Sequence, residues 1–182
     1  MKKRTALFVS LALVLAVSVG ATIAWLTDST QEVVNKFLPS TVDVELTETP
    51  REYKMVPGCD IAKDPKVTFK AGSEASWVFV KVEESGGFGE YTFDSYMAYT
   101  IAEGWTELDG VAGVYYREVA ASDTNQTFQV LENDKVTVKD TVTKAMMDGL
   151  TQETYPKLTF TAYAIQKEQT GTVTEAWAKI PK

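Results

Sequence analysis

The side chains in this chain that could do chemistry are mostly carboxylates, and they fall into two loose groups. Asp60 and Asp64 form the first, and Asp123 with the run Glu132-Asn133-Asp134 forms the second. A calcium site needs several oxygen ligands in one short loop, but no EF-hand spacing is present, and Asp and Asn are common turn residues. A glycosidase needs two facing carboxylates, and no motif singles out such a pair among the 25 acidic residues. The sequence therefore predicts turns here, with no catalytic, metal-binding or cofactor-binding residue.

The chain contains no histidine and a single cysteine. It therefore has no Ser-His-Asp triad, no Cys-His pair and no His-ligated zinc site. One cysteine also allows no internal disulfide and no thiolate cluster. Cys59 lies in Val56-Pro57-Gly58-Cys59-Asp60. It is either a covalent link between subunits or a small half-buried turn residue, and the second role is the more common one.

Six aromatic residues are large enough to line a sugar-binding groove, although such residues more often supply a core and cross-strand pairs. They are Trp77, Trp105, Tyr115, Tyr116, Tyr163 and Trp177.

The charge of the chain argues against nucleic acid as a partner. Its 18 basic and 25 acidic residues give a formal charge of -7, whereas nucleic-acid binding needs clustered Lys and Arg.

The first 24 residues have the pattern of an export signal. Lys2, Lys3 and Arg4 form a basic start, and the segment from Leu7 to Val19 is apolar. Thr22 and Ala24 then give the small-x-small pattern that a signal peptidase recognises, which predicts cleavage between Ala24 and Trp25.

The alternative is a retained N-terminal anchor, because the uncharged run from Thr5 to Thr27 is long enough to span a bilayer. The membrane would then be contacted only through this uncleaved segment. Cleavage removes three basic residues and no acidic one, so the formal charge of the processed chain becomes -10.

Beyond residue 41 the hydrophobic pattern has a period of two, which is typical of half-buried strands. The run from Trp77 to Val82 is apolar on both alternating faces and predicts a central strand covered on both sides. In the run from Leu158 to Ile165 we expect one face to carry Leu158, Phe160, Ala162 and Ala164. Further strands are predicted at Val42–Leu46, Lys66–Lys70, Val114–Val119, Thr127–Leu131 and Val136–Val138.

Helical spacing is clear only in Thr141–Leu150, and residues 91–105 fit both helix and strand. Many short strands at turn-punctuated spacing, with one or two short helices, are typical of an all-β sandwich or barrel. The predicted organisation is a signal helix over residues 1–24, an N-terminal arm over 25–40 and one β domain over 41–182.

Several segments together resemble the camelysin/TasA-like family of Gram-positive exported proteins, which depend on a SipW-type signal peptidase. The junction Gly20-Ala21-Thr22-Ile23-Ala24-Trp25-Leu26-Thr27-Asp28, followed by Asn35-Lys36-Phe37, is similar to the family's processing region. Met55-Val56-Pro57-Gly58 with Lys63-Asp64-Pro65 and Val67 resembles a second signature, and Trp77–Val82 resembles the strand that follows. Tyr155–Lys167 with Ala176-Trp177 is similar to the C-terminal end.

The resemblance implies a single secreted β-sandwich of jelly-roll type, in a protein of the cell surface or biofilm matrix that assembles into fibres. Some members are described as metalloproteases, but this chain has no histidine to ligate zinc. It also departs from the pattern at Phe37-Leu38-Pro39-Ser40, where a glycine often follows the phenylalanine.

Fibre assembly in that family implies donor-strand complementation, in which the arm of one subunit fills an open sheet edge of the next. The matching arm here is Trp25–Ser40, with apolar anchors at Trp25, Leu26, Val33, Val34 and Phe37. The alternative is an arm that packs on its own subunit.

The sequence and the resemblance together predict a non-enzymatic, exported structural protein. Its partners would be further copies of itself, other matrix proteins and, during export, the signal peptidase. The alternatives are a monomeric surface adhesin or carbohydrate-binding module, and an exported hydrolase that uses only carboxylates.

Overall fold

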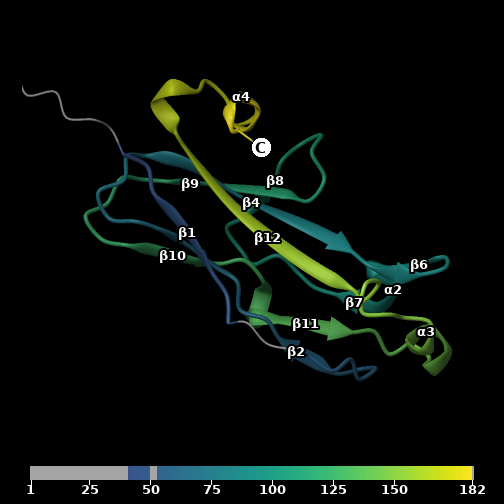
Figure 1. Cartoon of the computed structure of the whole chain (residues 1–182). Coiled ribbons are helices and arrows are strands. Elements are labelled where there is room, and N and C mark those ends of the chain that lie inside the picture. The colour runs from purple at the N-terminus through teal and green to yellow at the C-terminus, as the bar shows by residue number, and fades with distance from the viewer. Residues whose placement is uncertain (1–40, 50–52, 182) are drawn as a thin grey trace, which may run out of the picture. The chain divides into compact units, whose positions relative to one another are not determined.

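A computed structural model describes residues 41–49 and 53–181 of the chain (Figure 1). The signal segment, the expected cleavage residues Thr22, Ala24 and Trp25, and the five arm anchors all lie outside the described residues. Within the described part, no helix is both long enough and apolar enough to cross a membrane.

The described residues form twelve strands arranged in four antiparallel sheets. The strands in the first half of the domain are β1 (Val44–Thr47), β2 (Asp60–Ala62), β3 (Lys66–Phe69), β4 (Ser76–Ser85), β5 (Gly87–Phe88) and β6 (Tyr91–Thr92). Those in the second half are β7 (Met97–Ala98), β8 (Thr106–Glu107), β9 (Val114–Val119), β10 (Gln126–Gln129), β11 (Lys135–Val138) and β12 (Lys157–Gln166). The all-β prediction is confirmed at this level.

Three short α-helices accompany the strands in this part of the chain, where the sequence predicted one or two. They are α2 (Phe93–Tyr96), α3 (Lys144–Asp148) and α4 (Val173–Lys179), and there are also two 3₁₀ turns, η1 (Glu132–Asp134) and η2 (Lys167–Gln169). The stretch 91–105 contains β6, α2 and β7, which have only two, four and two residues, so it mixes strand and helix and its pattern fits both.

The two larger sheets have the strand orders β12-β4-β9-β8 and β1-β3-β10, and each places its most buried strand in the interior. Val78 and Val80 of β4 are fully buried, as are Val67 and Phe69 of β3. These four side chains belong to one hydrophobic cluster, which therefore joins the two sheets.

The opposite face of β4 is also covered, as its doubly apolar sequence predicts. Phe79 is fully buried in a second cluster with Trp177 of α4, Leu108 and Val114. Its ring centroid lies 5.2 Å from that of Trp177, which in turn lies 5.5 Å from Tyr163 of β12. Helix α4 thus closes the outer face of the four-stranded sheet.

The start of α4 is fixed by a capping box. The Thr172 hydroxyl accepts a hydrogen bond from the Glu175 amide at 3.2 Å, and the Glu175 carboxylate accepts one from the Thr172 amide at 3.2 Å. The reciprocal bonds satisfy two amides that a helix start otherwise leaves unpaired.

A third, smaller cluster fills the end of the domain that carries the sheet β2-β11-β7 with helices α2 and α3 (Figure 1). Its buried members are Ile61, Tyr96, Val138, Val142 and Met146. The Tyr96 hydroxyl donates to the carbonyl of Met146 at 3.3 Å, which links α2 to α3.

Trp177→Ala tests whether α4 is part of the fold. Removing the indole leaves a cavity over Phe79, so we expect the free energy of unfolding to fall by about 3–5 kcal/mol in chemical denaturation. Tyr155→Ala is the control, because half of that side chain is already exposed, and its expected loss is about 0.5 kcal/mol. Equal losses for the two variants would contradict a structural role for α4.

Candidate functional site

The first acidic group does not form a ligand cluster. Asp60 accepts hydrogen bonds from Lys135 at 2.8 Å and Thr137 at 2.6 Å, and these bonds lower the pKa of its carboxyl. Asp64 accepts from the Thr49 amide and hydroxyl, which lowers its pKa as well. Asp60 therefore links its segment to Lys135 and Thr137, and Asp64 links its segment to Thr49. Among the described residues, no group of three Asp, Glu or Cys side chains is placed to hold a metal ion.

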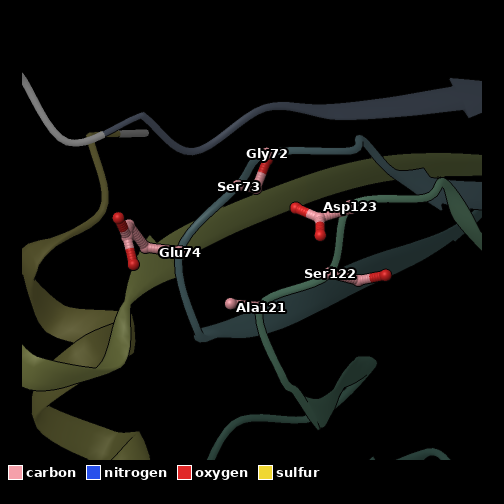
Figure 2. Close-up of a pocket in the computed structure, with 6 residues that line it drawn as sticks. All are labelled: Gly72, Ser73, Glu74, Ala121, Ser122 and Asp123. Carbon is pink, nitrogen blue, oxygen red and sulfur yellow. The ribbon is translucent and has the colours of Figure 1, made fainter.

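The second acidic group is dispersed in the same way. Asn133 and Asp134 adopt φ values of 56° and 50° within η1, and so form the turn that the sequence predicts. Asp123 instead lies in an open recess with Gly72, Ser73, Glu74, Ala121 and Ser122 (Figure 2). Its two carboxylates, Glu74 and Asp123, are far fewer than the oxygen ligands that calcium takes.

The recess marks the place where the chain enters the described domain. The Glu74 amide donates to the Thr41 carbonyl at 3.1 Å, and the Asp43 amide donates to the Ser73 hydroxyl at 3.1 Å. The Gly72–Glu74 turn thereby fixes the residues that lead into β1.

Cys59 lies in a turn, as predicted, but it is exposed and not half-buried. Its amide donates to the carbonyl of Val56 at 3.0 Å, which closes the Pro57-Gly58 turn. Gly58 has a φ of 76°, a conformation that favours glycine.

The six large aromatic residues pack within the two main clusters. Trp105 and Tyr115 belong to the cluster between the larger sheets. The cluster under α4 contains Trp77, Tyr116, Tyr163 and Trp177. Because these rings pack on one another and on the sheets, they give no support to a sugar-binding groove.

Strand β12 has the longest open edge among the described strands. Its ten residues pair with β4 on one side, and no described strand pairs with it on the other. The Lys167 amide donates to the Ala75 carbonyl at 2.9 Å, and these residues form the next pair of the same register. Since hydrogen-bonded and non-bonded pairs alternate in an antiparallel ladder, odd-numbered residues of β12 bond to β4. The backbone groups of Leu158, Phe160, Ala162 and Ala164 therefore face away from it.

The same four residues turn their side chains toward the main cluster, which is the hydrophobic cluster that joins the two larger sheets. Phe160 is buried there, and Leu158, Ala162 and Ala164 are partly buried. At this edge, amide and carbonyl groups that pair with no described strand lie beside an apolar surface, and an added strand needs both.

Strand β1 lies against β12 without a hydrogen-bonded ladder between them in the described part (Figure 1). The Lys70 amide donates to the Asp43 carbonyl at 3.0 Å, so odd-numbered residues of β1 bond to β3. The backbone groups of Val44 and Leu46 face away from β3, and their side chains pack on the main cluster. Two open edges, one from each larger sheet, thus lie together.

The remaining edge of the smaller of these sheets, at β10, is covered in part. On β10 the Gln129 carbonyl accepts a hydrogen bond from the Trp105 indole at 2.7 Å. Just beyond the strand, Ile101 forms an antiparallel bridge with Leu131. The pair of edges at β1 and β12 is therefore the candidate functional site.

A polar contact stands at one end of this region. The Tyr99 phenol donates to the Glu84 carboxylate at 2.6 Å, and Leu158 is the register partner of Glu84 on β12. Partial burial raises the pKa of Tyr99 above its ordinary value, and this hydrogen bond is the second largest cause of the rise. Burial also raises the pKa of the neighbouring Tyr115.

The open edge was not predictable from the sequence, although the strand itself was. The pattern of Leu158–Ile165 identifies a strand and its two faces, but edge position depends on which strands become neighbours. The available signal was weak: Ala162 and Ala164 leave little side-chain bulk above the edge.

No family model, curated protein or solved structure matches this chain.

Tyr99→Phe tests the contact with Glu84 through pH. A tyrosine whose folded pKa is raised contributes stability that is present below the unfolded pKa of about 10 and is lost as pH rises toward the folded pKa. We expect wild-type unfolding free energy to fall above pH 10, and the variant to fall less steeply. At neutral pH the variant should lose roughly 1 kcal/mol with the hydrogen bond. Parallel pH profiles would contradict the assignment.

Proposed function

We propose that this chain is an exported, non-enzymatic structural protein of the cell surface or biofilm matrix that self-associates into fibres. The observation that carries the proposal is strand β12, whose outward-facing backbone groups at Leu158, Phe160, Ala162 and Ala164 pair with no described strand. Exposed edges of this kind are the usual route of strand-by-strand association, and monomeric proteins commonly protect them.

The proposed acceptor is the pair of edges at β12 and β1, and the proposed donor is the arm Trp25–Ser40 of another copy. Main-chain hydrogen bonds to β12 would supply affinity, and the apolar anchors of the arm would set its register against the main cluster. The arm joins the domain at Thr41, which the Gly72–Glu74 turn holds in place.

The proposed domain architecture is a β-sandwich of jelly-roll type. Its support is the hydrophobic cluster shared by the β12-β4-β9-β8 and β1-β3-β10 sheets. In such a sandwich, β1 and β12 would be the two edge strands on one side, where a donated strand can extend either sheet.

Deleting residues 25–36 tests the donor. We expect the exported variant to keep the wild-type thermal unfolding transition, because the described core contains none of these residues, and to stay monomeric in sedimentation. Electron microscopy should show fibres for the wild type alone. A second variant with Ser at all five anchors keeps the arm length and should behave like the deletion. Fibres from either variant, or failure of both to fold, would refute the arm as donor.

Ala162→Pro tests β12 as the acceptor. Proline removes an amide hydrogen that faces away from β4, a position where edge strands tolerate it, so the domain should fold while the edge can no longer pair fully. Thr161→Pro is the matched control, because it removes a hydrogen bond to β4 and should destabilise the domain by about 3 kcal/mol or more. Fibre growth from folded Ala162→Pro at the wild-type rate, followed by light scattering, would exclude this edge.

A further inference from the structure

Arg117 is the one arginine among the described residues, and it stands on a buried face of the four-stranded sheet. In the register of β9 with β4 it is paired with Val78, whose side chain is fully buried between the larger sheets. Register partners project to the same face of a sheet, so the Arg117 side chain is directed toward the main cluster. An arginine in such a position usually has a carboxylate partner.

Two aromatic rings hold the guanidinium in a corner. Its central carbon lies 3.8 Å from the ring centroid of Phe128 and 5.2 Å from that of Trp105. The two rings are nearly perpendicular, with an interplanar angle of 86° and centroids 6.5 Å apart. The Trp105 indole is itself fixed by its 2.7 Å hydrogen bond to Gln129. The guanidinium is thus pre-oriented, which reduces the entropy that a bound partner must overcome.

The cation has no anionic partner in the described part of the chain. Seven lysines there form ion pairs with Asp or Glu, and Arg117 forms none. Its Nε is buried and lacks a hydrogen-bond acceptor. Burial lowers the pKa of the guanidinium from its ordinary value, but arginine stays charged at neutral pH.

Gly104 packs closely against the guanidinium. A methyl group at Gly104 would lie only 2.8 Å from the Nη2 atom of Arg117, so a larger residue would press on the guanidinium. Gly104 is exposed, and Arg117 is partly exposed. The Nη edge can therefore meet a ligand from solvent while the Nε side stays enclosed.

We propose that the partly exposed Arg117, in the corner formed by Trp105 and Phe128 and beside Gly104, is a binding site for a single carboxylate. The two Nη groups form a planar fork that matches the two oxygens of a carboxylate. A monoanion suits the site better than a phosphate dianion, because the chain carries a formal charge of -7 and repels the more highly charged ligand more strongly. The carboxylate could belong to a small molecule or to an acidic side chain of a second copy.

The site is tested by NMR titration of the exported protein, diluted until it is monomeric. Sodium acetate replaces sodium chloride at constant ionic strength, and the reporters are the Arg117 Nε–H and Trp105 indole signals. We expect a saturable shift of both. Arg117→Lys keeps the charge but loses the fork, and should weaken acetate binding by about tenfold or more. Lys144→Gln removes an exposed charge elsewhere and should leave binding unchanged.

A linear drift without saturation, equal binding by Arg117→Lys with an unchanged unfolding transition, or tighter binding of inorganic phosphate would overturn the proposal. Sedimentation at assembly concentrations then distinguishes the two sources. If a second copy supplies the carboxylate, acetate and Arg117→Lys both reduce assembly. If a small molecule supplies it, assembly is unchanged while acetate still binds. A wild type that never assembles would refute the proposed function, and the titration would still decide the site.

Discussion

Strand β4 needs burial on both of its faces, and the rest of the domain is arranged around that need. Val78, Val80 and Val82 project to one side, and Phe79 projects to the other. The β1-β3-β10 sheet covers the valines, and α4 covers Phe79. The first cover is partly local in sequence, because β3 ends at Phe69 and β4 begins at Ser76, whereas α4 begins only at Val173. The cover over Phe79 therefore depends on a contact between segments far apart in the chain.

Covering both faces of β4 leaves the edges of its sheet as the remaining problem. A helix packed on a face buries side chains, but it cannot satisfy the amides and carbonyls along the outermost strand. At β10 the Trp105 indole bonds to the Gln129 carbonyl, and just beyond the strand Ile101 forms a bridge with Leu131. At Leu158, Phe160, Ala162 and Ala164 of β12 no described strand supplies partners, although β12 is as long as β4. The contrast between a partly covered edge and an open one makes β12 the place where another strand can add.

Local burial was readable from the sequence, and spatial neighbourhood was not. Val114–Val119 and the two faces of Leu158–Ile165 were predicted well, because alternation directly records which side chains are buried. The third helix was missed, although Thr172 and Glu175 carry the spacing of a capping box. The corner around Arg117 could not be foreseen, since Trp105 reaches it from the segment before β8 and Phe128 from β10, and no local pattern specifies that the two meet. The same holds for the meeting of β1 with β12.

The charge of the chain decides which kind of association suits it. Copies of the chain repel one another, with a formal charge of -7 for the full chain and -10 after the expected cleavage, and seven of the lysines that could offset this repulsion already pair within the described domain. An interface built on ion pairs between subunits would therefore have few unpaired lysine side chains to use. Backbone pairing along β12 avoids that deficit, because amides and carbonyls are neutral dipoles whose attraction is short-ranged and is little screened by salt. Repulsion between whole subunits acts over a Debye length of about 8 Å at physiological ionic strength. Salt should therefore change mainly the rate at which subunits meet. The strength of the contact, once formed, would come from hydrogen bonds and from the apolar residues beneath the edge.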